Sequence, residues 1–321
     1  MQPEPVDLGR LAPLLDDPAV CDVLVNPDGR VWIEREGRLE TTGLRCQPGE
    51  VLLLIERIVT PLGLRVDRAR PVVEARLPDG SRVHAVVPPV ACDGPCLAIR
   101  RFRPRAIGLH EMGSSEVADL LGALVAARWN LLVSGGTGAG KTTLLNALAG
   151  RIVEGERLVT VEDAAELRLR QPHVVRLEAR PPNAEGAGAI DIRELVRAAL
   201  RLRPDRLIIG EVRGAEAFDM VQAMNTGHDG SMSTVHANSP GDALRRLEAL
   251  VLMAGVGLPL EAITEQIGSA VDGVIHVVRT PDGRRSVTEI GEVRYGPESA
   301  RVRPLVCGGS VVAEPARVSR P

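Results

Sequence analysis

One glycine-rich stretch, residues 135–142 (GGTGAGKT), constrains the fold of this chain more than any other feature. It follows a short apolar segment at 130–134 that predicts a strand, and it opens a segment through Leu148 with helical spacing. Its glycines let the backbone curl so that amide groups face inward at the start of a helix, which forms a nest for anions. A strand, a curled loop and a helix in this order predict an α/β sheet with a phosphate site at the strand ends.

The stretch also holds Lys141, the single lysine among 39 Lys and Arg residues. Lysine carries a compact ammonium on a flexible stem, whereas arginine carries a rigid planar guanidinium. The single lysine is therefore expected where a guanidinium does not fit. The pattern G-x-x-x-x-G-K-T places the ammonium on the β- and γ-phosphates and the Thr142 hydroxyl on Mg²⁺, so we predict ATP and Mg²⁺ as cofactors. A glycine-rich turn followed by Lys-Thr by chance is the alternative. The predicted cofactor-binding residues are Gly135, Gly136, Thr137, Gly138, Ala139, Gly140, Lys141, Thr142 and Thr143.

The pattern of predicted elements changes once along the chain. Residues 1–102 contain hairpin turns between alternating strands, which indicate a small α+β domain with an antiparallel sheet. Over residues 117–310, strands alternate with helices, which predicts a mostly parallel sheet covered by helices on both faces. Residues 103–116 have the prolines and glycines of a linker, and 311–321 are expected to be a disordered tail. The predicted fold class is therefore α/β, with a smaller α+β domain in front.

Composition excludes several classes of protein. The formal net charge is −3 and the aromatic residues are two Trp, two Phe and one Tyr, so direct binding of nucleic acid by a basic, base-stacking surface is not expected. No apolar run reaches the roughly 18–20 residues that span a bilayer, and the N-terminus has no apolar signal core. We therefore expect a cytoplasmic protein, peripheral at the inner face of the cell membrane through partners only. Its five cysteines are expected to be reduced thiols, with half of a metal site at Cys92 and Cys96 as the alternative.

A carboxylate ends the apolar strand predicted at 206–210, at the edge where such sheets bind ligands. Glu211 is predicted to orient and deprotonate an attacking water, and a solvated strand-end glutamate is the alternative. Many phosphate-loop enzymes place an aspartate just before this glutamate to support Mg²⁺, but here that position is Gly210. The metal-supporting acid must therefore come from elsewhere.

The preceding predicted strand supplies candidates for that acid. Glu162 is ranked first and Asp163 second, with Glu166 one turn later as the third candidate. Together with Thr142, Glu162 and Asp163 are expected to hold Mg²⁺ partly through water, because Mg²⁺ keeps several of its waters. For Asp163, a helix N-terminal cap is the alternative.

Two of the six histidines, His228 and His236, fall within nine residues that also contain glycine. One lies at a predicted helix end and the other at a predicted strand end. We expect both to sense or stabilise the γ-phosphate. A metal site, for which no further ligands cluster nearby, and a purely structural pair are the alternatives.

These motifs resemble, in order and spacing, the Walker A, Asp box, Walker B and His box of secretion traffic ATPases. That family comprises the hexameric motors of type II and type IV secretion and of type IV pili. The matching segments are residues 135–142 (GGTGAGKT), 161–163 (VED), 210–214 (GEVRG) and 226–230 (TGHDG). Segments at 16–26, 75–83 and 93–102 of the N-terminal half look like the CpaF/TadA branch, which powers assembly of Tad (Flp) pili.

The resemblance implies a RecA-like phosphate-loop NTPase domain after a smaller PAS-like domain. It also implies a homo-hexamer with ATP between the two domains, and an inner-membrane platform protein as partner. Arginines of the N-terminal domain reach the phosphates in this family. The matching positions are Arg100 and Arg101, followed by Arg103, and ordinary surface arginines are the alternative. The expected catalytic set is then Glu211, Glu162, His228, His236, Arg100 and Arg101.

The resemblance implies ATP hydrolysis that powers Tad/Flp-type pilus assembly or type II/IV secretion across the inner membrane. The four-cysteine zinc module common in the type II branch is missing from the sequence, which argues against that branch. One alternative is a conjugal-transfer motor that moves DNA or protein, which neighbouring relaxase genes rather than prepilin genes would favour. Another is a non-hydrolysing, ATP-gated assembly scaffold. The motifs define neither the cargo nor the direction of movement, and the short N-terminus leaves the docking surface undefined.

Overall fold

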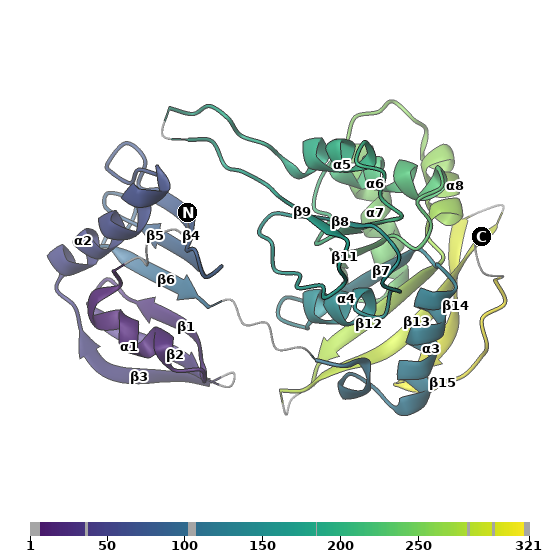
Figure 1. Cartoon of the computed structure of the whole chain (residues 1–321), viewed down its shortest axis with the longest axis horizontal. Helices are drawn as coiled ribbons and strands as arrows, with labels where there is room; N and C mark the ends of the chain where they lie inside the picture. Colours follow the sequence, from purple (N-terminus) through teal and green to yellow (C-terminus); the bar gives the residue numbers. More distant parts are fainter. Residues whose placement is uncertain are drawn as a thin grey trace. The chain divides into compact units, whose positions relative to one another are not determined.

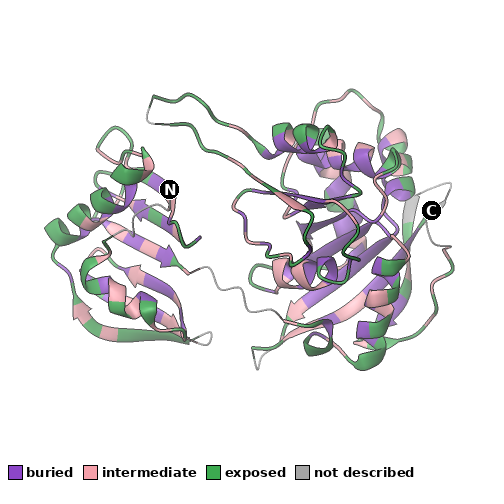
Figure 2. Ribbon diagram, in the orientation of Figure 1, coloured by how far each residue is buried: buried purple, intermediate pink, exposed green. Residues whose placement is uncertain are grey.

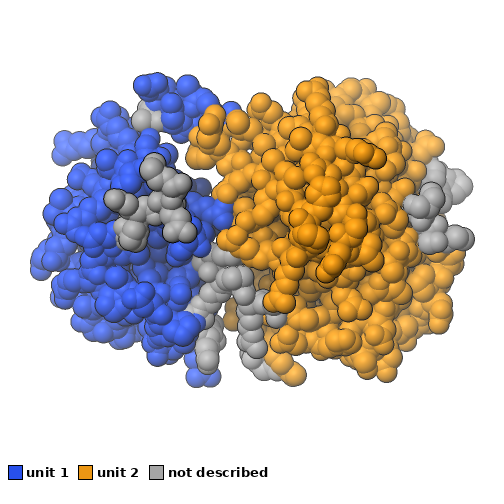
Figure 3. Space-filling view, viewed as in Figure 1, with its two compact units in different colours: residues 1–104, 182–189 blue, residues 105–181, 190–321 orange. Residues whose placement is uncertain are grey.

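The computed structural model describes residues 7–35, 38–101, 107–183, 185–280, 283–296 and 299–317. The chain forms two compact units, one of residues 1–104 and 182–189 and the other of residues 105–181 and 190–321 (Figures 1 and 3). Each unit has its own sheet and its own apolar core, and Figure 2 shows buried residues concentrated on the strands. None of the described helices combines the length and the apolarity needed to cross a membrane. All five cysteines are free thiols.

The smaller unit is built on a six-stranded sheet in the order β3-β2-β1-β6-β5-β4, in which every neighbouring pair is antiparallel. Its strands are β1 (Val20–Val25), β2 (Arg30–Arg35), β3 (Arg38–Arg45), β4 (Val72–Arg76), β5 (Arg82–Val86) and β6 (Cys96–Arg100). Its helices are η1 (Gly9–Leu11), α1 (Ala12–Asp16), α2 (Pro48–Val59) and η2 (Thr60–Leu62). The predicted antiparallel α+β architecture is confirmed.

The larger unit is built on a nine-stranded sheet in the order β15-β14-β13-β12-β7-β11-β10-β8-β9. The six strands from β12 to β9 run parallel, and β13, β14 and β15 continue the sheet antiparallel at one edge. The strands are β7 (Leu131–Gly135), β8 (Leu158–Glu162), β9 (Val174–Glu178), β10 (Arg206–Ile209), β11 (Met232–His236), β12 (Gly273–Arg279), β13 (Arg285–Gly296), β14 (Ser299–Cys307) and β15 (Ser310–Val311). The helices are η3 (Leu109–Glu111), α3 (Ser115–Ala126), α4 (Lys141–Ala149), α5 (Ile192–Leu200), α6 (Glu216–Asn225), α7 (Pro240–Met253) and α8 (Leu260–Ala270).

Helices cover both faces of this sheet. Successive strand residues point to opposite sides, and apolar residues on both sides need to be buried. Leu132 and Val274 pack in the core with α5, α6, α7 and α8. Their neighbours Leu131, Val133 and Ile275 pack in a second core with α3 and α4. The prediction of a mostly parallel sheet wrapped on both faces is confirmed. It places the carboxyl ends of the parallel strands at one edge, where the predicted phosphate loop leaves β7 (Figure 1).

The described part of the expected linker belongs to the larger unit. Leu109 and Met112 are buried in the core that contains α3 and α4, and Ser114 caps α3 by accepting from the Val117 amide. Residues 102–106 lie outside the described residues. Residues 182–189, expected in the ATPase domain, belong to the smaller unit, where Arg70 donates to the carbonyl oxygen of Asn183 at 3.2 Å.

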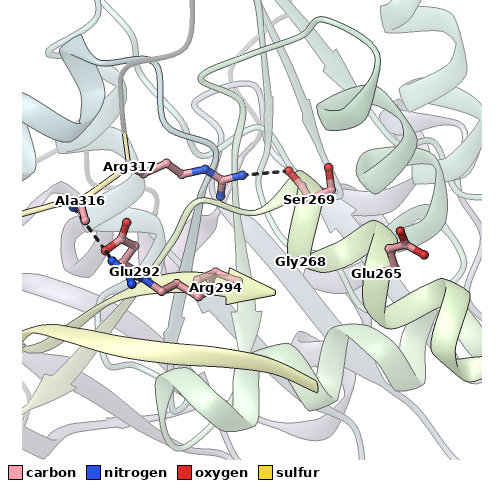
Figure 4. Close-up of a pocket in the computed structure, with 8 residues that line it drawn as sticks. Glu265, Gly268, Ser269, Glu292, Arg294, Ala316 and Arg317 are labelled. Atoms are coloured by element: carbon pink, nitrogen blue, oxygen red, sulfur yellow. Dashed lines mark hydrogen bonds and ion pairs between the residues drawn. The ribbon is translucent and has the colours of Figure 1, made fainter. Parts of the chain in front are cut away.

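The expected disordered tail also differs from the structure through residue 317. The Val312 amide donates to the carbonyl oxygen of Leu305 at 2.8 Å, and the Arg317 guanidinium lies 2.6 Å from buried Asp272. This C-terminal segment borders a pocket that is also lined by Glu265 and Glu292 (Figure 4). Asp272 directly precedes β12, so this pocket lies toward the amino end of a parallel strand and not at the phosphate loop.

Candidate active site

The glycine-rich stretch forms the predicted loop between β7 and α4. Gly138 and Gly140 have φ angles of +71° and +102°, which L side chains rarely adopt, so both positions require glycine. Helix α4 begins at Lys141, and the amides of its first turn have no partner within the helix. Strand β7 lies parallel to β11, with Gly135 opposite His236 at the shared carboxyl end. The loop therefore offers free amides and a positive helix end to an anion.

The Lys141 ammonium turns back over this loop. Its Nζ donates to the carbonyl oxygens of Gly135 and Gly136, both at 3.1 Å, and the residue is only 7% exposed. Nζ also lies 3.3 Å from each ring nitrogen of His236, so it is aligned with neither nitrogen. Burial lowers the pKa of Lys141, and the nearby Glu211 carboxylate opposes that shift. A compact cation thus occupies the interior of the loop.

Charged and polar contacts continue from Lys141 to the end of β10. His236 Nε2 lies 2.8 Å from Glu211 Oε1, but this oxygen is buried and has no hydrogen-bond partner among the described residues. The distance is therefore short without the geometry of a hydrogen bond. The other oxygen, Oε2, accepts from Arg213 Nε at 2.7 Å, and Arg213 also faces Asp163 at 3.6 Å. Oε1 is thus the oxygen of Glu211 that can accept from a water.

Glu162 is buried at the end of β8 with one satisfied and one unsatisfied oxygen. Its Oε1 accepts from the amides of Glu166 and Leu167, both at 2.9 Å. Its Oε2 is buried and has no partner among the described residues, and burial raises the pKa of this carboxyl to about 7. An orphaned carboxylate oxygen at the carboxyl edge of the sheet fits a cation or a cation-bound water, so the residues present are compatible with Mg²⁺.

The position of Glu162 also explains why glycine precedes Glu211. A Cβ built on Gly210 would lie 3.0 Å from Glu162 Cγ. The Glu162 side chain therefore fills the space that an aspartate at 210 would need. In this chain the buried carboxylate next to position 210 comes from Glu162 at the end of β8.

We expect Gly210→Asp to lower the free energy of unfolding by about 3 kcal/mol, because it overpacks the site and adds a carboxylate beside a buried one. Gly210→Ala adds a single methyl at the same place, so a loss of about 1 kcal/mol is expected. Urea unfolding of the three proteins measures both values. Equal stability of the aspartate and alanine variants would contradict this account of the glycine.

The structure separates the two predicted histidines. His236 ends β11 beside Lys141, whereas His228 precedes the same strand, and its Nδ1 lies 3.2 Å from the carbonyl oxygen of Ala223. The two ends of a five-residue strand are roughly 13 Å apart, and ligands bind at the carboxyl end. The two rings therefore lie apart within a single chain, and contact of His228 with the γ-phosphate stays a prediction. His236 keeps the predicted position, and the ring of His228 lies at the turn after α6.

The two predicted arginines lie in the smaller unit. Arg100 Nε donates to Asp22 Oδ1 at 2.9 Å, and its side chain is 67% exposed. Arg101 donates to the carbonyl oxygen of Asp17 at 2.6 Å. Arg103 lies outside the described residues. Contact of these arginines with a nucleotide stays a prediction.

Arg285, at the start of β13, was not predicted from the sequence although its side chain lies against the loop. A Cβ built on Gly140 would be 2.3 Å from Arg285 Cδ. Because nearly every basic residue of the chain is arginine, nothing in the sequence distinguishes this one.

Comparisons with known proteins identify the family of this chain. The chain matches the family described as "Type II/IV secretion system protein" over residues 4–309. It is 43% identical over 306 residues to a putative conjugal transfer protein of Mycobacterium tuberculosis, covering 92% of this chain and 86% of the relative. It is 36% identical to the conjugal transfer protein TrbB of Rhizobium radiobacter, covering 86% of this chain and 84% of the relative. The crystal structure of the VirB11 ATPase from the Brucella suis type IV secretion system, in complex with sulphate, is 29% identical, with a TM-score of 0.50 and coverage of 88% and 92%.

Proposed function

Because the chain belongs to the type II/IV secretion system protein family, we propose that it is a motor that hydrolyses ATP to ADP and phosphate. One observation carries this proposal. The buried ammonium of Lys141 lies within the phosphate loop and, through His236, adjoins the buried Oε1 of Glu211, which accepts no hydrogen bond from the described residues. A phosphate-binding cation beside a carboxylate that can take a proton is the arrangement that hydrolysis of a phosphoanhydride requires.

In the proposed reaction, the loop amides and Lys141 hold the β- and γ-phosphates. Glu211 Oε1 accepts a proton from a water whose oxygen attacks the γ-phosphorus in line. The bond between that phosphorus and the bridging oxygen then breaks, its electron pair stays on ADP, and the proton passes on to the products. His236 stabilises the charge that develops on the γ-phosphoryl oxygens. Mg²⁺, when bound, neutralises phosphate charge, and Thr142, Glu162 and Asp163 would hold it, partly through water.

The family and its relatives also support a proposed assembly. The active form is a homo-hexamer in which Arg100 and Arg101 reach the phosphates of the nucleotide, where a planar fork suits the non-bridging oxygens. We propose that an inner-membrane platform protein of a secretion or pilus apparatus is the partner, and that the chain is cytoplasmic and reaches the membrane only through that partner. No direct contact with nucleic acid is proposed.

Two cargoes remain candidates, each with its own support. The N-terminal segments that look like the CpaF/TadA branch support Tad (Flp) pilus assembly. The similarity to conjugal transfer and type IV secretion proteins supports a conjugal-transfer or type IV secretion motor that moves DNA or protein. Deletion of the gene distinguishes them, because the first predicts loss of surface pili and the second loss of transfer with pili retained.

We expect the purified full-length chain to form hexamers, with phosphate release per subunit rising over the protein concentrations at which they assemble. The reason is that, in the proposed assembly, Arg100 and Arg101 reach the phosphates of the nucleotide in the hexamer. Light scattering and steady-state phosphate release on the same samples measure both quantities. A monomer with concentration-independent activity would contradict the hexamer and leave the hydrolysis standing, whereas a hexamer without phosphate release would contradict the hydrolysis.

A further inference from the structure

The hairpin of β12 and β13 borders the phosphate loop at both of its ends. A Cβ built on Gly135 would lie 2.4 Å from the carbonyl oxygen of Val277 in β12. A Cβ built on Gly140 would lie 2.3 Å from Cδ of Arg285 in β13, and 3.0 Å from its Cγ and Nε. The stem of Arg285 therefore lies flat against the last glycine of the loop. Any other residue at position 140 would displace it.

The guanidinium of Arg285 contains a donor, Nε, that is buried and unsatisfied among the described residues. A buried donor on a charged group is costly when unpaired, so such a group in a native protein calls for an explanation. Gly140, which the stem of Arg285 covers, directly precedes helix α4, whose first backbone amides donate. An anion at the start of α4 could accept from these amides and from the guanidinium together.

Sheet order decides which part of a bound nucleotide this arginine meets. Strands β12 and β13 lie on one side of β7, whereas β11 and β10 lie on the other. His236 ends β11 and Glu211 follows β10, so the proposed reaction places the γ-phosphate and its attacking water on that second side. Arg285 approaches the loop from the opposite side. It is thus placed at the phosphates that remain in ADP.

We propose that Arg285 is a nucleotide-binding residue that donates to the α- and β-phosphates, the part common to ATP and ADP. The proposal rests on the proposed function of the loop. Because a contact with these phosphates is the same before and during γ-phosphoryl transfer, it contributes to binding of the nucleotide and not to the chemical step. Arg285 therefore differs in role from Lys141, which reaches the γ-phosphate, and from Glu211, which activates water.

The test is calorimetric titration of ADP into the full-length wild type, Arg285→Gln and the control Arg284→Gln. Arg284 is the exposed neighbour in the same hairpin, and the hydrogen bonds from Thr280 go to its backbone oxygen, which the substitution leaves in place. We expect the Kd for ADP to rise about tenfold or more in Arg285→Gln and less than about twofold in the control. The Michaelis constant for ATP should rise in parallel, with kcat within about threefold of the wild type.

A second variant separates binding from folding. Arg285→Lys keeps the charge and most of the stem that packs on Gly140 but loses the fork, so we expect an intermediate Kd at an unchanged thermal midpoint. ADP affinity of Arg285→Gln within twofold of the wild type would overturn the proposal. A fall in kcat with unchanged ADP affinity would overturn it as well, since it would place Arg285 at the transferred phosphoryl group. A wild type that binds no ADP would instead overturn the proposed function of the loop, and this inference with it.

Discussion

Lys141→Arg is expected to abolish ATP turnover, lowering phosphate release by about 10³-fold or more, although it keeps the positive charge. The ammonium lies between two loop carbonyls at 3.1 Å and the ring of His236. The guanidinium is wider and planar, so it must either displace the loop or leave the phosphate position. Either outcome removes the cation from the charge that develops on the transferred phosphoryl group.

The matched control exchanges the same two residue types at an exposed site. Arg201 lies exposed at the end of α5, and we expect Arg201→Lys to leave phosphate release within about twofold of the wild type. Steady-state phosphate release and the unfolding midpoint should be measured for both variants. If Lys141→Arg keeps more than about a tenth of wild-type activity, the size argument for the solitary lysine fails.

Glu211→Gln is expected to bind ATP with nearly wild-type affinity but to lower phosphate release by about 10²- to 10⁴-fold. The amide has the shape of the carboxylate and can still accept from Arg213, so the site keeps its form. It cannot take a proton from water, so the loss falls on the chemical step and appears in kcat. Calorimetric titration with ATP and steady-state phosphate release measure the two effects separately.

The alternative is that Glu211 is only a solvated glutamate at a strand end, and Glu178 provides the control for it. It ends β9, the next parallel strand, lies opposite Glu162 in the register and is exposed. Glu178→Gln should leave phosphate release within about threefold of the wild type. If Glu178→Gln and Glu211→Gln lower phosphate release equally, Glu211 contributes only negative charge at this edge of the sheet and does not activate water.

Much of the fold could be predicted because two kinds of periodicity are strong in this sequence. The alternation of strands with helices along the chain predicts the parallel sheet. The alternation of apolar and polar residues within the hairpins predicts the antiparallel sheet. Strand β3 lies at the edge of its sheet, and most of its residues are exposed. An exposed edge strand does not need alternating apolar residues, so its sequence does not predict it. Leu109 and Met112 look like linker residues between glycines, and only the tertiary core shows that they are buried.

The site could be predicted where a residue follows directly from a strand end. Glu162 ends β8 and Glu211 follows β10, so both lie at the carboxyl edge that these parallel strands share with β7, from which the loop of Lys141 starts. His228 and His236 are near in sequence but belong to opposite ends of one strand, and proximity along the chain could not show this. Arg285 reaches the loop from a distant hairpin, and no local pattern marks a contact of that kind.

Steady-state phosphate release by the full-length wild type, assembled as hexamers with ATP and Mg²⁺, tests most directly whether this chain is a motor. We predict continuous release over many turnovers, abolished when the metal is chelated. Binding of ATP without any release of phosphate under these conditions would contradict hydrolysis, and would identify the chain as an ATP-gated scaffold.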